Sequence, residues 1–221
     1  MIAIILGIIM GIFHYFSDIL CLKCKPYQNY LISFSAGISI TYIFLHLLPQ
    51  FTYGITQISN FLFLSILIGF VIFHIVEKYI YQHSPEDKLL RELAVEDSIT
   101  SFIYHFVIGI ILVSFVNQGL SEGILFFIPV FLFTAVSTLP VDMTKFKSIK
   151  AILAVSTLLG IIFATFIYPN MNQIIYFALL GFIIGALLFT VTRHSIPKKR
   201  QGKPFYFIIG VIIYSVLIYL L

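Results

Sequence analysis

Four polar residues and a proline near the middle of the chain could contact a solute inside a membrane. His105 interrupts one long apolar run, and a second run is interrupted by Ser137, Thr138, Pro140 and Asp142. A neutral imidazole can bind a divalent metal or relay a proton, and a proline within a helix frees a backbone carbonyl. Polar side chains at membrane depth usually face a bundle interior or a solute path. We therefore predict a transport path through His105 and its neighbour Tyr104, together with Ser137, Thr138 and Pro140. His105 and Asp142 are the candidate metal ligands.

Each of these residues also has a purely structural interpretation. His105 could be a buried histidine bonded to a neighbouring helix, and Ser137 and Thr138 could be hydrogen-bond donors between helices. Asp142 lies close to the basic segment 145–150, where an ion pair at the membrane interface would account for it. Both interpretations stay open for these residues.

Two further pairs of polar residues lie at helical spacing. His14 and Asp18 are four residues apart, and His74 and Glu77 are three apart, so the members of each pair share a helix face. Either pair could relay protons or form half of a metal site. We favour hydrogen-bonded networks near the membrane interface for both.

Residues near the ends of the apolar runs could handle a metal on its way in or out. His46 closes the second run and is a candidate entrance residue. His194 ends the seventh run at the same spacing but lies beside a basic loop, and this position favours a structural role for both histidines. Cys21 and Cys24 form a C-x-x-C motif at a candidate exit. A structural disulfide is not expected in a reducing compartment, and a complete zinc site needs about four ligands.

The composition places the chain in a membrane. Of its 221 residues, 60% are hydrophobic and 10% are charged, whereas soluble domains average about 45–50% and about 25%. The first apolar run lacks the features of a cleaved signal peptide, so we expect it to remain as a helix. No basic aromatic surface for nucleic acid is present, and neither is a Ser/His/Asp triad, a P-loop or an HExxH motif. We predict no enzymatic activity and no cofactor.

Eight apolar runs are long enough, at about 20 residues each, to cross a bilayer as helices. The predicted fold is therefore an all-α integral membrane protein with one membrane domain over residues 1–221. A longer cytoplasmic loop is expected at 82–98. The eight runs cover residues 2–20, 30–50, 58–80, 99–117, 121–143, 149–168, 172–193 and 204–221.

The basic residues predict the orientation of these helices. All 13 lysines and arginines lie in or beside four connections, at 23–25, 78–91, 145–150 and 193–203. Every one of these connections follows an odd-numbered run. Because cytoplasmic loops are enriched in lysine and arginine, we expect these loops inside the cell and both termini outside, in the plasma (cytoplasmic) membrane.

An internal repeat connects the two halves of the chain. The segments Gly37–Pro49 and Gly185–Pro197 share the spacing G-x8-H-x2-P and would cross the membrane in opposite directions. Inverted repeats are typical of transporters. We predict a 3+2+3 arrangement in which residues 1–81 form one three-helix repeat, 99–143 a central helix pair, and 149–221 the inverted repeat.

The second and seventh runs carry a resemblance to a known family. The segment Ser33–Gln50, with its Ala-Gly pair and His-Leu-Leu-Pro motif, resembles the second helix of the zinc/iron-regulated transporter-like (ZIP) permeases. The segment Gly185–Pro197 is similar to the seventh helix of that family. Eight spans, outward termini and a 3+2+3 plan also match. The resemblance implies transport of a divalent metal such as zinc into the cytoplasm.

The same resemblance indicates where a metal site would lie. Anchored on Gly109, the metal-binding motif of the family's fourth helix places Tyr104 and His105 at its first two ligand positions and Ile108 at the acid. Anchored on His105 as the first ligand, the same motif places Gly109 at the acid. In the fifth helix, segment 137–142 keeps the family's proline, but two hydroxyls stand at ligand positions and the acid comes one residue late. The resemblance thus implies a divergent member with a degenerate, single metal site.

Two functions follow from these observations. The first is a ZIP-like permease that moves a divalent cation into the cytoplasm. The alternative is a ZIP-fold membrane protein without metal transport, which would carry another small solute or act as a sensor or partner subunit. We expect the lipid bilayer as the main partner, a homodimer as a candidate assembly, and no nucleic acid.

Overall fold

The computed structural model describes residues 1–24, 27–136, 147–195 and 202–221. Within these ranges the side chains of residues 17–24, 90, 94, 97, 136, 147–150, 194 and 195 lie outside the described set. The described residues form helices and their connections, without strands. The α-helices are α1 (Ile2–Cys24), α2 (Gln28–Tyr42), α3 (Leu48–Thr56), α4 (Phe63–His83), α5 (Glu86–Gln118), α6 (Leu120–Val136), α7 (Lys147–Ile162), α8 (Gln173–Thr190) and α9 (Pro204–Leu220).

Within the described ranges, four helical stretches are long and apolar enough to cross a membrane: Gln28–Thr56, Asn60–His83, Glu86–Gln118 and Gln173–Arg193. The first joins α2 to α3 through a π-helical turn at Ile43–Leu47. Shorter apolar helices lie at Ile2–Phe16, Leu120–Ala135, Ala151–Ile167 and Pro204–Leu220. By length and composition the chain is a membrane protein. Apolar side chains can face lipid, and a helix satisfies all its backbone hydrogen-bonding groups internally, so an apolar helix is stable in a membrane.

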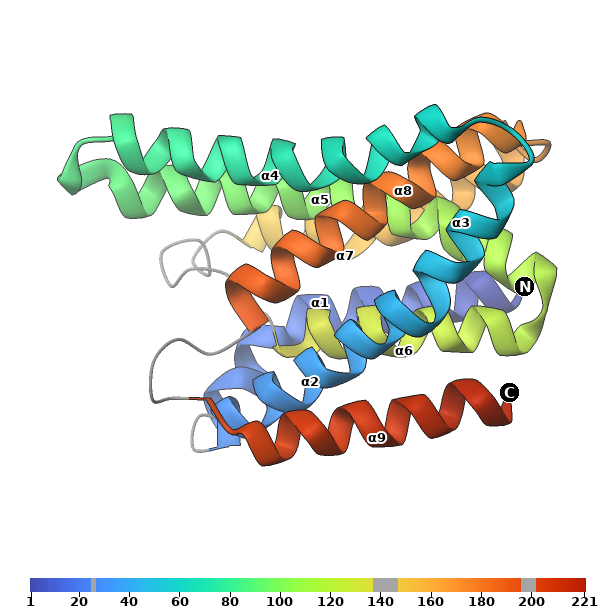
Figure 1. Cartoon of the computed structure of the whole chain (residues 1–221). Helices are drawn as coiled ribbons and strands as arrows, with labels where there is room; N and C mark the ends of the chain where they lie inside the picture. Colours follow the sequence, from blue (N-terminus) through green and yellow to red (C-terminus); the bar gives the residue numbers. More distant parts are fainter. Residues whose placement is uncertain (25–26, 137–146, 196–201) are drawn as a thin grey trace.

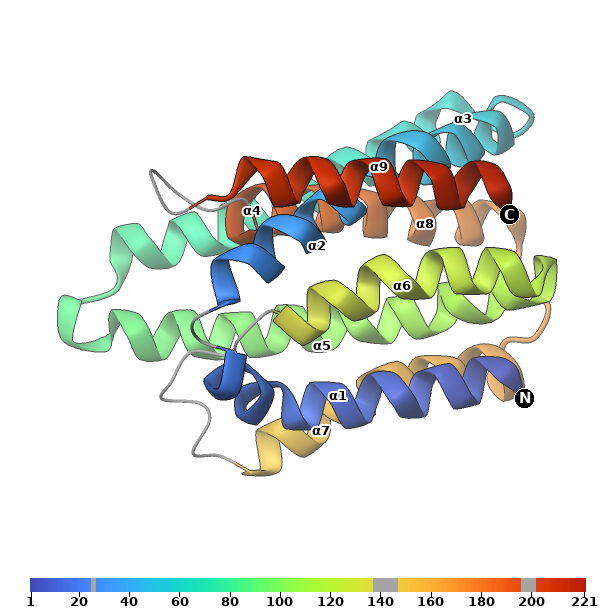
Figure 2. The ribbon, with the colours of Figure 1, turned by 90° about the horizontal axis from the view of Figure 1, so that it is seen from below.

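The predicted loop at 82–98 is mostly helical. The chain turns at Ser84 and Pro85, and α5 then runs without interruption from Glu86 to Gln118. At 1.5 Å per residue its 33 residues span about 50 Å, which exceeds the roughly 30 Å of a bilayer's hydrocarbon core. The α4–α5 hairpin accordingly extends beyond the other described helices at the end of the bundle opposite the two termini (Figures 1 and 2).

Most helices run roughly lengthwise and pack in pairs, as Figures 1 and 2 show. Helix α2 packs against α9, α4 against α8, and α5 against both α6 and α7. Helix α1 packs against α7 and α6, which places α1, α5 and α6 around a common centre. The buried apolar side chains of these helices form one continuous core.

Glycines allow two of these pairs to approach closely. A Cβ atom at Gly37 of α2 would overlap the carbonyl oxygen of Phe207 in α9. A Cβ atom at Gly185 of α8 would overlap the carbonyl oxygen of Ile66 in α4. Small residues at helix crossings let backbones meet in this way in membrane proteins. Each crossing therefore requires glycine for its close backbone contact.

Candidate functional site

His105 is buried where α1, α5 and α6 converge, and its side chain is 2% exposed. Its Nδ1–H donates to the carbonyl oxygen of Ser101 at 2.8 Å. Its Nε2 lies 2.9 Å from the hydroxyl oxygen of Thr134 on α6. The ring of His14 on α1 meets it edge-on, with the centroids 4.8 Å apart and the planes at 88°. A polar cluster of two imidazoles and a hydroxyl thus lies inside an otherwise apolar bundle.

Both nitrogens of His105 are engaged in this arrangement. The Thr134 hydroxyl has a single hydrogen, which either Nε2 or the Val130 carbonyl oxygen, 2.8 Å away, can accept. A metal ion that bound Nε2 would replace its contact with Thr134 and leave the bond to Val130 in place. A neutral imidazole with two such contacts can orient a polar solute or pass a proton toward a neighbouring hydroxyl. Within the described residues, no group of three or more His, Cys, Asp or Glu side chains could hold a metal ion.

Tyr104, which directly precedes His105 on α5, lies beside this cluster. Its side chain is buried, and its ring lies 5.2 Å from the His105 ring and 6.3 Å from that of Phe133, centroid to centroid. No described residue forms a hydrogen bond with its hydroxyl group. The other predicted path residues, Ser137, Thr138 and Pro140, lie outside the described residues, and so does the candidate metal ligand Asp142.

Sequence reasoning missed Thr134 and linked His14 to a different partner. Thr134 lies one turn before the predicted segment 137–142, and as a lone hydroxyl in an apolar run it was detectable from the sequence. His14 was expected to pair with Asp18, whose side chain lies outside the described set. In the structure the His14 ring contacts His105.

A second polar group lies at the end of the bundle that carries the two termini. His46, in the π-helical turn Ile43–Leu47, places Nε2 2.8 Å from a carboxylate oxygen of Glu122 in the first turn of α6. The His46 ring also stacks on Tyr42, at 5.2 Å between centroids and 18° between planes. His46, the predicted entrance residue, therefore has a carboxylate partner that the sequence pattern did not reveal.

One turn further along, a second bridge joins α3 to α5. The side-chain amide of Gln50 donates to Gln118 at the end of α5, at 3.0 Å. Gln118 in turn donates to the hydroxyl group of Tyr176 on α8, at 3.2 Å. The Gln50–Gln118 and His46–Glu122 bonds connect the end of the α5–α6 hairpin to the helix that contains α2 and α3.

The opposite end of the bundle contains an ion pair. Arg193 donates from Nε to a carboxylate oxygen of Glu77 on α4 at 2.8 Å, and a second guanidinium nitrogen lies 2.6 Å from the same oxygen. His74, expected to share a network with Glu77, instead contacts the rings of Phe70 and Phe189. The side chains of Cys21, Cys24 and His194 lie outside the described set, and so does Pro197.

Three buried hydroxyl groups on α2 were also missed. Ser35, Ser39 and Tyr42 are spaced by four and three residues and so share one face of the helix. None of their hydroxyl groups has a hydrogen-bond partner among the described residues. A buried polar group left without a partner costs about 1–3 kcal/mol, so this face is a candidate lining for a polar solute or water.

Comparisons with protein-family models and with curated proteins find no match for this chain.

Proposed function

We propose that this protein is a membrane permease of the ZIP-like plan that moves a divalent metal cation into the cytoplasm through a single site around His105. The observation that carries the proposal is the matched packing of two helix pairs. Gly37 packs against the Phe207 carbonyl of α9, and Gly185 packs in the same way against the Ile66 carbonyl of α4. Inverted repeats of this kind are typical of secondary transporters.

The correspondence extends along both helices. When Gly37 is aligned with Gly185, the π-helical turn Ile43–Leu47 falls on the π-helical turn Val191–Ser195 without any shift in register. Such turns are rare and occur frequently at functional sites. The match supports an inverted 3+2+3 repeat in which eight helices cross the membrane, the four shorter apolar helices included.

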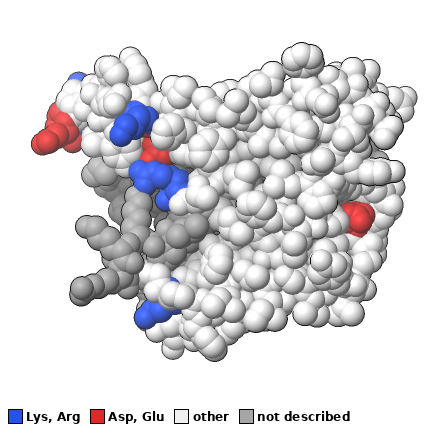
Figure 3. Space-filling model, viewed as in Figure 1, with Lys and Arg blue, Asp and Glu red and all other residues white. Residues whose placement is uncertain are grey.

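The distribution of charge supports the orientation. In the face shown in Figure 3, the lysines and arginines gather at the end of the molecule opposite the two termini. Cytoplasmic ends of membrane proteins are enriched in these residues. We therefore place the α4–α5 turn in the cytoplasm and both termini outside the cell.

The polar cluster around His105 would give the cation a weak site. A divalent ion loses a large hydration energy on burial, and carboxylates normally compensate for it. The described cluster offers His105, His14 and Thr134, and none of these is a carboxylate. We expect one bound metal at most, with low affinity, and release favoured over tight retention.

A second candidate function is a ZIP-fold protein that does not transport metal. The observation that favours it is that both ring nitrogens of His105 already have hydrogen-bond partners. The cluster would then serve a neutral solute, a sensing role or the contact with a partner subunit.

Uptake by reconstituted liposomes distinguishes these functions. With zinc, manganese or cadmium outside, we expect saturable uptake that His105→Ala abolishes. The exposed His74 provides the matched control, and His74→Ala should retain uptake. Cys21→Ser combined with Cys24→Ser should also leave uptake largely intact, because a candidate exit is not the central site.

Two outcomes would redirect the proposal. Zinc uptake that persists in His105→Ala protein would refute the site assignment. A correctly folded, unmodified protein that takes up none of the three metals would favour the function without metal transport.

A further inference from the structure

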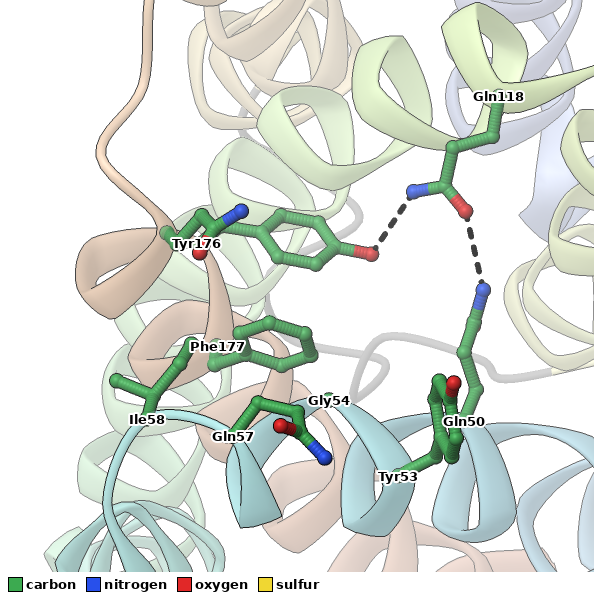
Figure 4. A pocket seen from close by; sticks show the side chains of 9 residues that line it. Gln50, Tyr53, Gly54, Gln57, Ile58, Gln118, Tyr176 and Phe177 are labelled. Atoms are coloured by element: carbon green, nitrogen blue, oxygen red, sulfur yellow. Dashed lines mark hydrogen bonds between the residues drawn. The ribbon is translucent and has the colours of Figure 1, made fainter.

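A pocket of about 350 Å³ opens at the end of the bundle that carries the termini. Its walls come from α3 and the turn after it, from the end of α5, and from the first turn of α8. Figure 4 shows the hydrogen-bonded chain from Gln50 through Gln118 to Tyr176 along one side, with Phe177 and Gln57 opposite. No function discussed above uses this pocket.

The lining is polar but uncharged. Four glutamines (Gln50, Gln57, Gln118 and Gln173) contribute amide groups, and Tyr53, Tyr176 and Phe177 contribute aromatic rings. None of the nine lining residues is acidic or basic. The nearby carboxylate of Glu122 is bonded to His46 and is not part of the lining. An ion in this pocket would find no opposite charge to offset its lost hydration.

Some of the polar atoms have unused hydrogen-bonding capacity. The side-chain oxygen of Gln50 is buried and accepts no hydrogen bond from any described residue. The Tyr176 hydroxyl accepts from Gln118 and keeps its own hydrogen available to donate. Because the Gln50 oxygen is buried, the groups that face the pocket are the Tyr176 hydroxyl and the glutamine amides of the lining, which can donate to and accept from a hydroxyl group.

The backbone of α3 makes room for an aromatic wall. A Cβ atom at Gly54 would overlap the ring of Phe177, so glycine allows this ring to lie directly on α3. The Tyr176 and Phe177 rings lie 4.9 Å apart, centroid to centroid, at 71°. Aromatic surface beside a few placed polar groups is the usual composition of a small-molecule site.

We infer that this pocket binds a small, uncharged, hydroxyl-rich molecule of the polyol or monosaccharide class. Its volume equals that of roughly a dozen water molecules at about 30 Å³ each, which matches a ligand with about that many non-hydrogen atoms. The amides and the tyrosine hydroxyl bind the ligand's hydroxyl groups, and the aromatic rings contact its C–H face. This inference does not depend on the proposed metal transport.

The absence of tryptophan from the chain allows a direct test. Tyr53 lies at the rim of the pocket and is 78% exposed, so Tyr53→Trp introduces a single fluorescent reporter with little effect on folding. Titration of the purified full-length protein with D-glucose and with sorbitol should give a saturable change in emission. Glucosamine, as a cation, and gluconate, as an anion, should bind at least about ten-fold more weakly because their charge remains uncompensated.

Variants at Gln118 locate the binding. In the Tyr53→Trp background, Gln118→Leu should weaken glucose binding about ten-fold, since it removes the partner of both Gln50 and Tyr176. Gln118→Glu keeps the shape of the side chain and should also weaken it. The matched control is Gln82→Leu at the other end of the bundle, which should leave the affinity unchanged.

Three results would overturn the inference. One is the lack of a saturable response to any uncharged compound, both in fluorescence and in ligand-observed saturation-transfer NMR on protein with Tyr53 intact. Another is an equal affinity in Gln118→Leu and Gln82→Leu proteins that unfold at the same temperature as the parent. The third is tighter binding of glucosamine than of glucose, which would make the pocket a cation site.

Discussion

Helices α2 and α8 have the same kind of backbone contact but bury opposite kinds of side chain. Each lays a glycine on a carbonyl oxygen of its neighbouring helix. On α2 the buried face carries Ser35, Ser39 and Tyr42, whereas Ile183 and Leu187 replace the two serines when α8 is aligned on its glycine. The hydroxyl groups on α2 have no described partner, while the corresponding face of α8 is almost entirely apolar.

This difference indicates that the two helices share a packing requirement but not a chemical role. Close backbone approach depends only on the absence of a side chain, so glycine preserves it whatever surrounds it. Buried hydroxyl groups without partners reduce stability, and retaining three on one face is difficult to explain by packing alone. In the proposed permease, α2 would therefore contribute polar groups to the path, and α8 would mainly support the fold.

The largest effect should come from breaking the shared contact. Gly37→Leu and Gly185→Leu should each lower the free energy of unfolding by about 3 kcal/mol or more, because the new side chain collides with a backbone carbonyl that cannot move aside. The loss should be similar at both positions. Thermal unfolding in detergent or nanodiscs measures it.

Gly119 provides the control for these substitutions. A Cβ atom there would find its nearest neighbour 3.8 Å away, at ordinary contact distance, and the backbone φ of 170° is open to any residue. Gly119→Ala should therefore change stability by less than about 0.5 kcal/mol. If Gly185→Leu unfolded like Gly119→Ala, the two crossings would not be equivalent.

The sequence predicted the helices better than the polar contacts. Apolar runs and the spacing shared by Gly37–Pro49 and Gly185–Pro197 are local features, so they can be read without knowledge of the fold. His46 and Glu122 are 76 residues apart, and no spacing rule connects them. The Gln50–Gln118 bond is equally remote, so neither it nor the pocket beside it was predicted.

The central site was predicted only in part. The sequence indicated His105 because an imidazole in an apolar run requires a partner, and the structure supplies Thr134 and the backbone of Ser101. It could not show that His14, from the first helix of the chain, would contact the same ring. Segment 137–142 lies outside the described residues, so its predicted part in the path stays a prediction.

An intermediate loss of stability should distinguish the Glu77–Arg193 bridge at one end of the bundle from the Glu122–His46 bridge at the other. Glu77→Gln leaves the partly buried Arg193 without its carboxylate, and a guanidinium group cannot lose its charge. Glu122→Gln keeps a side-chain amide that can still hydrogen-bond to the His46 ring. We expect a loss of about 1–3 kcal/mol for Glu77→Gln and less than about 1 kcal/mol for Glu122→Gln. Equal losses in chemical or thermal unfolding at pH 7.5 would contradict this difference between the ends.

The smallest change in the free energy of unfolding should have opposite signs on the polar face of α2 and on the apolar face of α8. Tyr42 and Thr190 stand at corresponding positions in the alignment of Gly37 with Gly185, but only Thr190 has a described hydrogen bond, to the Ala186 carbonyl at 2.6 Å. Tyr42→Phe removes a buried hydroxyl group without a described partner, so stability should stay constant or rise by up to about 1 kcal/mol. Thr190→Val removes a satisfied bond within α8 and should cost about 0.5 kcal/mol, the low end for a protein hydrogen bond. Matched unfolding curves in nanodiscs measure both changes, and a clear destabilisation by Tyr42→Phe would mean that its hydroxyl group is bonded within the folded protein. If stability is kept while uptake in liposomes falls, the hydroxyl group of Tyr42 serves the solute and not the fold.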